Sequence, residues 1–132
     1  MTLDLGQAPV ILVIEDVEEV RDAIERLLLV SGYRVSTARD EEEAILKARL
    51  RSPNLILLNL GLDDIQTSEI GRRIRQNSGL SERVPVVVFC VATLAEGAEA
   101  EVGANVYTTR PDNFDQLRTL LSRLVRRQPR TY

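Results

Sequence analysis

Side chains that could do chemistry stand directly after the apolar runs of this sequence. Glu15 and Asp16 end the first run, Asn59 the run at 55–58, Cys90 the run beginning at residue 84, and Arg110 the half-polar segment at 105–108. Carboxylate oxygens are the ligands that hard cations such as magnesium prefer. These positions therefore predict a polar site, provided that the fold brings them together.

Residue counts exclude several kinds of site. The chain has no histidine and one cysteine. Imidazole bases, phosphohistidine carriers, internal disulfides and thiolate zinc sites are therefore excluded. Any bound metal would be a hard cation held by oxygen atoms.

Composition predicts one globular domain over residues 1–132, with a folded part at about 9–127. The 132 residues are 44% hydrophobic and carry a net charge of −3, which offers no basic field for nucleic acid. No apolar stretch reaches the roughly 18 residues of a membrane span, and residues 1–7 do not resemble a secretory signal. We expect a cytoplasmic protein that binds neither nucleic acid nor membrane.

Hydrophobic patterning predicts strands alternating with helices. Unbroken apolar runs at 10–14, 55–58 and 84–90 indicate buried central strands, whereas the mixed segments 33–37 and 105–108 indicate edge strands. Apolar residues at helical spacing predict five helices. The first runs from about residue 17 to Ser31, the second from an Asp40 cap to Ser52, and the third through Ile70 and Ile74 to about residue 77. The fourth runs from Leu94 to about Val102, and the fifth from about residue 117 to Gln128.

This alternation predicts an α/β fold of the (βα)5 type. Its doubly wound, parallel five-stranded sheet would have helices on both faces and the strand order 2-1-3-4-5. Because the carboxyl ends of parallel strands meet at one edge, Glu15, Asp16, Asn59, Cys90 and Arg110 should lie near one another.

Together, these motifs resemble the response-regulator receiver domain, a flavodoxin-like fold, over residues 10 to about 125. The resemblance rests on the acidic pair Glu15 and Asp16, Pro-Asn-Leu-Ile-Leu-Leu-Asn-Leu at 53–60, Pro85, and Gly-Ala-Asn-Val-Tyr-Thr-Thr-Arg-Pro at 103–111. It implies that the acidic pair binds magnesium. It also implies an Asp after strand three that accepts a phosphoryl group, a Ser or Thr after strand four, and a Lys before the last Pro.

Three of these positions depart from the family pattern. Asn59 stands at the phospho-acceptor position, Cys90 at the hydroxyl position and Arg110 at the lysine position, while Asp63 replaces the usual Pro. A neutral amide is not a carboxylate nucleophile and forms no stable acyl phosphate. The chain is therefore interpreted as a pseudo-receiver in which ordinary phosphorylation is absent.

The remaining site residues each have two interpretations. Glu15 and Asp16 could hold magnesium weakly, or be solvated acids that favour a helix dipole. Arg110 could lie over these acids as a fixed counter-ion, or be an exposed loop residue. Cys90 could be buried and inert, or a redox sensor. Tyr107 matches the family's switch aromatic, and without a phosphoryl signal it would keep one rotamer or form an interface contact.

The leading functional hypothesis is a non-enzymatic, phosphorylation-independent protein-interaction module in two-component-type signal transduction. The resemblance implies contact through the face made by the fourth helix, fifth strand and fifth helix. The partner would be a kinase, an output protein or a second copy in a homodimer. In a variant of this hypothesis, a ligand or a redox change at Cys90 switches the domain.

Two other functions remain as alternatives. A magnesium-dependent hydrolase of the haloacid-dehalogenase type would need Asp16 as its nucleophile, and the chain lacks the later acid pair of that class. A flavin- or nucleotide-binding domain would need a phosphate cradle. The first turn, at residues 15–19, has four acids and no glycine, so it would repel a phosphate.

Overall fold

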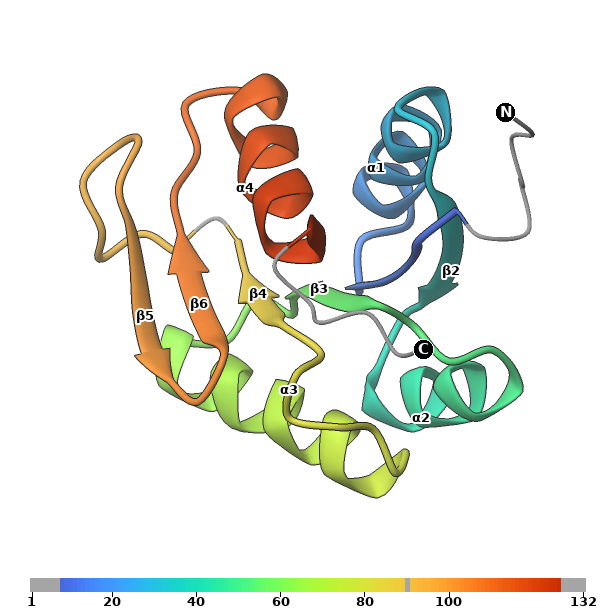
Figure 1. Ribbon diagram of the computed structural model, residues 1–132. Helices are drawn as coiled ribbons and strands as arrows, with labels where there is room; N and C mark the ends of the chain where they lie inside the picture. The colour runs from blue at the N-terminus through green and yellow to red at the C-terminus, as the bar shows by residue number, and fades with distance from the viewer. Residues whose placement is uncertain (1–7, 90, 127–132) are drawn as a thin grey trace.

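The fully apolar runs form the centre of one sheet in the computed structural model, which describes residues 8–89 and 91–126. The strands β1 (Val10–Glu15), β3 (Leu55–Asn59) and β4 (Val86–Val88) lie side by side and parallel. Helices cover both faces of this part of the sheet (Figure 1). Every position on these strands therefore needs an apolar side chain, apart from the strand ends.

The predicted strand order is confirmed for the parallel strands. β2 (Arg34–Ala38) pairs with β1 at one edge, and β6 (Val106–Thr109) pairs with β4. The order β2-β1-β3-β4-β6 corresponds to the expected 2-1-3-4-5. A further strand, β5 (Glu99–Gly103), adds antiparallel to β6 and forms the other edge.

The helices divide between the two faces of the sheet. α1 (Glu18–Val30) and α4 (Phe114–Arg126) cover one face, and α2 (Glu41–Leu50) and α3 (Asp64–Asn77) cover the other (Figure 1). Each pair packs on its own apolar cluster, because side chains alternate between the faces of a strand. No helix within the described residues is long and apolar enough to cross a membrane.

Local signals set the ends of these helices as predicted. Asp40 caps α2 by accepting a hydrogen bond from the Glu43 backbone N–H at 2.8 Å. Gly32 follows the end of α1 with a φ of 95°, a left-handed conformation that glycine adopts without steric cost. These contacts explain why the sequence located both ends closely.

The predicted helix from Leu94 to Val102 is wrong, because this segment forms a turn followed by β5. Gly97 has a φ of 80°, which an α-helix cannot accommodate. The Gly97 N–H donates to the Arg110 carbonyl at 2.7 Å, and the Arg110 N–H donates to the Ala98 carbonyl at 3.0 Å. Alanine and glutamate favour a helix locally, but pairing with β6 satisfies the backbone of this segment instead.

Two expectations that depended on this helix also change. The described residues contain four helices in place of the five expected, and the segment at 105–108 is not the edge of the sheet because β5 lies beyond it. All four residues of β6 are buried. The polar Thr108 contributed to the half-polar pattern of this segment although it lies inside the fold.

A buried arginine anchors the turn between β5 and β6. Arg75 on α3 donates to the Ala104 carbonyl at 3.0 Å and to the Val84 carbonyl at 3.0 Å. Asn105 takes a φ of 58° and donates through its side chain to the Arg83 carbonyl at 2.8 Å. These bonds satisfy carbonyl groups where the hairpin reverses direction, so they stabilise the strand in place of a helix.

Amide exchange would test the strand assignment at residues 99–103. The Ala98 carbonyl accepts a hydrogen bond from the Arg110 N–H, so Ala98 faces the chain of β6. Successive residues of an antiparallel strand alternate in direction, so the Ala100 N–H points toward β6 and the N–H groups of Glu99 and Glu101 point to solvent. We expect the Ala100 amide to exchange at least about tenfold more slowly than those of Glu99 and Glu101. Equal protection of all three amides would indicate a helix instead.

Substituting Gly71 would test the close packing of α3 on the sheet. A Cβ atom at Gly71 would lie 2.4 Å from the Val86 Cγ1 atom. We expect Gly71→Ala to lower the free energy of unfolding by about 1–2 kcal/mol, because overpacking exceeds the gain in helix propensity. Urea unfolding measures this difference. Gln76→Ala, an exposed change on the same helix, should change stability by less than about 0.5 kcal/mol.

Candidate functional site

The register of β1 and β3 places Glu15 directly beside Asn59. The Asn59 Nδ2 group donates to the Glu15 Oε1 atom at 3.3 Å, and the Val17 backbone N–H donates to Glu15 Oε2 at 3.0 Å. An ionised carboxylate only accepts hydrogen bonds, so the amide must present its NH2 group. The Glu15 side chain is buried, and both of its oxygen atoms have a donor.

Burial raises the pKa of the Glu15 carboxyl group above its ordinary value. The Val17 N–H opposes this rise by bonding to the carboxylate, whereas the adjacent Asp16 adds to it; the Asn59 amide lowers the pKa slightly. Asp16 itself is exposed. The buried and exposed members of the acidic pair therefore have different environments.

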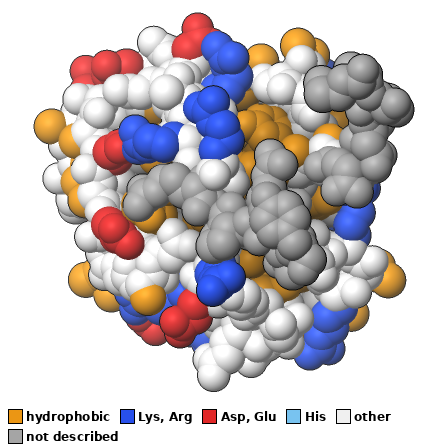
Figure 2. Space-filling model, viewed as in Figure 1, with side chains coloured by type: hydrophobic (Ala, Val, Ile, Leu, Met, Phe, Trp, Pro, Cys, Tyr) orange, Lys and Arg blue, Asp and Glu red, His pale blue; other side chains and the backbone are white. Residues whose placement is uncertain are grey.

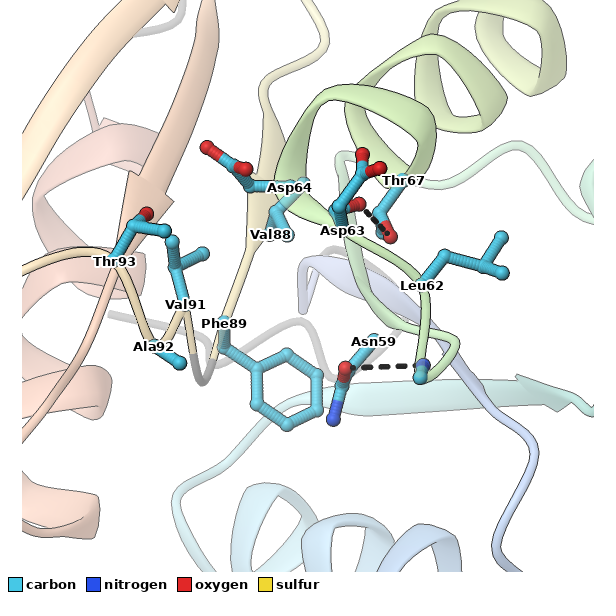
Figure 3. Close-up of a pocket in the computed structure, with 11 residues that line it drawn as sticks. Asn59, Leu62, Asp63, Asp64, Thr67, Val88, Phe89, Val91, Ala92 and Thr93 are labelled. Carbon is cyan, nitrogen blue, oxygen red and sulfur yellow. Dashed lines mark hydrogen bonds between the residues drawn. The ribbon is translucent and has the colours of Figure 1, made fainter.

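A cleft of about 370 Å³ lies beside Asn59, between the ends of β3 and β4 and the start of α3. Figure 3 shows Asn59 and Phe89 on one side, and Asp63, Asp64 and Thr67 on the other. The Gly61 N–H donates to Asn59 Oδ1 at 3.5 Å. No basic residue lines the cleft among the described residues, so its charged groups would repel an anion.

Sequence reasoning missed the role of Asp63 in this cleft. Its side chain caps α3 by accepting a hydrogen bond from the Gln66 N–H at 2.7 Å, and its carbonyl accepts one from the Thr67 hydroxyl at 2.9 Å. An acid followed three residues later by Gln is a helix-start signal that could have identified it. Asp63 therefore fixes the loop beyond Asn59 where the family usually has proline.

Arg110 does not lie over the acidic pair. Its side chain is partly buried, and its Nη1 group donates to the Leu94 carbonyl at 3.0 Å. No ion pair within residues 8–89 and 91–126 includes it. The predicted counter-ion contact is therefore wrong in this structure, because the turn before β5 brings a carbonyl group within reach of the guanidinium. The exposed-loop alternative is also wrong.

Tyr107 points into the core. It is 9% exposed and belongs to the apolar cluster that contains Phe89 and Leu117, while its hydroxyl group donates to Asn105 Oδ1 at 3.0 Å. Tyr107 is therefore not part of an exposed contact surface here, and the single-rotamer interpretation stays a prediction. Cys90 lies outside the described residues, so both interpretations of its thiol stay predictions.

The acidic pair does not form a full magnesium site. Among the residues that the structure describes, no cluster combines three Asp, Glu, His or Cys side chains that could hold a metal. The third group beside Glu15 is the Asn59 amide, which turns its NH2 donors toward the carboxylate. These residues do not fit a three-carboxylate site, and weak magnesium binding at Glu15 and Asp16 stays a prediction.

Comparison with known proteins identifies the class of this fold and site. The sequence profile of the response regulator receiver domain matches residues 11–122. The chain belongs to this family.

Its curated relatives include a transcriptional regulatory protein and a response regulator. It is 32% identical over 123 residues to the KDP operon transcriptional regulatory protein KdpE of Escherichia coli, covering 92% of this chain and 53% of that protein. It is 30% identical over 121 residues to the response regulator ArlR of Staphylococcus aureus, covering 90% and 53%. The chain therefore spans about half the length of these curated relatives.

Solved receiver structures share the fold. A two-component response regulator from Clostridium difficile superposes with a TM-score of 0.67 at 19% identity, covering 92% of this chain and 99% of that one. TrrA from Thermotoga maritima superposes with a TM-score of 0.65 at 22% identity, covering 88% and 98%. The flavodoxin-like receiver fold predicted from the sequence is confirmed.

The raised pKa of Glu15 predicts a pH effect on stability. A carboxyl group whose pKa is higher in the folded state stabilises the fold while protonated, and this contribution is lost as pH rises through the raised pKa. The free energy of unfolding of the wild type should therefore decrease as pH rises above about 4.5. We expect this decrease to be smaller in Glu15→Gln. Urea unfolding of both proteins between pH 4 and 8 measures the difference. A constant difference across this range would contradict the assignment.

Proposed function

We propose that this receiver domain is a non-enzymatic protein-interaction module that works in two-component signalling without phosphorylation. The observation that carries the proposal is the hydrogen bond from the Asn59 Nδ2 group to the Glu15 carboxylate. This amide occupies the strand end where phosphorylation would require a nucleophilic carboxylate. The site is thereby satisfied internally, without an added phosphoryl group.

The charges around Asn59 support the same proposal. The cleft contains Asp63 and Asp64, and the Arg110 guanidinium is bonded to the Leu94 carbonyl. A phosphoryl group carries negative charge that the protein must neutralise during transfer. Within the described part of the chain, the groups beside Asn59 would oppose that charge.

The contact surface in this proposal differs from the helix-based face expected from the sequence. β5, β6 and α4 make up the corresponding side of the molecule, with β5 at its edge (Figure 1). A kinase, an output protein or a second copy of the chain are the candidate partners. Receiver domains as a family act by contacting such proteins.

Phosphorylation can be tested directly by mass measurement. We expect the intact mass to stay unchanged after incubation with acetyl phosphate and magnesium, because the Asn59 amide cannot form a stable acyl phosphate. Beryllofluoride with magnesium should leave the NMR spectrum unchanged. TrrA, whose solved structure contains Mg2+ and BeF, serves as the positive control. A magnesium-dependent adduct on the wild-type chain would overturn the proposal.

Substituting Asn59 with aspartate should create electrostatic repulsion between residue 59 and the Glu15 carboxylate. In Asn59→Asp, a second carboxylate would replace the donor that lies 3.3 Å from Glu15 Oε1. We expect a loss of about 1–3 kcal/mol in stability at pH 7, with magnesium recovering part of it in the variant and having little effect on the wild type. Thermal melts with and without magnesium measure both effects. Asn54→Asp, which alters a different amide near the opposite end of β3, is the matched control and should show no magnesium response.

A further inference from the structure

The outer edge of β5 has no neighbouring strand among the described residues. Antiparallel pairing sets Glu99 opposite Thr109, Ala100 opposite Thr108 and Glu101 opposite Tyr107. Because Ala98 and Ala100 take the hydrogen-bonded positions, the backbone N–H and C=O groups of Glu99 and Glu101 point away from β6. This edge therefore presents a ladder of backbone donors and acceptors.

The two faces of this edge differ in chemistry. Glu99 contacts Arg123 of α4, so Glu99 and Glu101 lie on the α4 face of the sheet. Figure 2 shows acidic side chains along the side of the molecule where β5 lies. Ala100 and Val102 lie on the α3 face instead.

A groove lined by both apolar and charged side chains lies beside the edge on the α3 face. Val102 lines this cavity of about 190 Å³ together with the apolar Ile65, the polar Ser68 and Thr108, and the charged Asp64, Glu69 and Arg72. Ile65 is 72% exposed and Val102 is 47% exposed. The fourth helix expected from the sequence would cover this region, but the segment forms β5, so these side chains stay open to solvent.

A second copy of the chain does not suit this edge. Antiparallel pairing of two β5 strands about Ala100 would set Glu99 of one copy opposite Glu101 of the other, twice. Like charges directly opposite each other on neighbouring strands are destabilising. Glu99 already forms an ion pair with Arg123, whereas Glu101 has none among the described residues. Glu101 in particular therefore disfavours self-pairing and favours a positively charged partner.

We propose that the β5 edge binds an extended segment of a partner protein in which basic and apolar residues alternate. The segment adds a strand to the sheet through the backbone groups of Glu99 and Glu101. Its basic side chains lie beside these carboxylates, and its apolar side chains lie beside Ala100 and Val102 and enter the groove at Ile65. This inference rests on the proposed role as an interaction module and names the partner's chemistry.

Peptide binding tests the proposal. A labelled, capped seven-residue peptide with lysine and valine in alternation is titrated with the full chain, and fluorescence anisotropy is recorded. We expect saturable binding that weakens with salt. A peptide of the same composition with all lysines before the valines should bind at least about tenfold more weakly. Equal binding of both peptides, or no binding at millimolar protein, would overturn the proposal.

Backbone methylation separates strand addition from simple charge attraction. One peptide carries N-methyl groups on its lysines and another carries them on its valines. Alternate N–H groups of a strand point in opposite directions, so methylation should abolish binding in only one of the two peptides. Loss in both, or in neither, would show that no strand is added.

Charge reversal locates the binding site. Glu101→Lys should weaken peptide binding by about three- to tenfold, whereas Glu42→Lys, an equal charge change at an exposed position on α2, should leave it unchanged. An equal effect of both variants would overturn the proposal. Mass measurement after acetyl phosphate treatment tests the phosphorylation-independent role separately, because its result does not depend on the peptide.

Discussion

The parallel pairing of β1 with β3 is the constraint on which the site depends. Both strands are buried on both faces, so their register is held by apolar side chains on either side of the sheet. That register leaves Glu15 and Asn59 as neighbours where the two strands leave the core. A carboxylate in this buried position needs hydrogen-bond donors, and the Asn59 amide is one that is available without a metal. The hydrogen bond between Asn59 and Glu15 is thus a consequence of the apolar packing that sets the register of β1 and β3.

The hairpin of β5 and β6 changes the side of the molecule where the sequence predicted a contact face. It occupies chain that was expected to form a helix, and it extends the sheet by one strand. The turn that leads into β5 brings the Leu94 carbonyl to Arg110, which holds the guanidinium away from the acidic pair. One local change in backbone pairing therefore alters both the exposed edge and the charge near Asn59. The two functional proposals are linked by this hairpin.

Two buried polar side chains, Arg75 and Tyr107, form hydrogen bonds near the turn of the β5–β6 hairpin. Arg75 is 5% exposed and bonds to carbonyl groups from two loops, which supports the hairpin turn from beneath. Tyr107 is bonded to Asn105 in the same region. These contacts connect the end of α3 with the start of β6, far from the Asn59 cleft. The hairpin is therefore anchored at its turn, while its outer edge stays accessible.

The sequence by itself determined the central strands, their order, most helix ends and the residues at the carboxyl edge. These features follow from signals that are local in the sequence: apolar runs such as 55–58, the Asp40 cap, and an amide at Asn59 where the family pattern has a carboxylate. Only the tertiary structure decided the conformation of Glu99–Gly103, the direction of Arg110 and the burial of Tyr107. Alanine and glutamate favour a helix when neighbours are ignored. The strand forms instead through pairing with residues three to ten positions further along the chain and through a turn that Arg75 of α3 anchors. Such contacts leave no periodic pattern in the sequence, so they had to be seen in the fold.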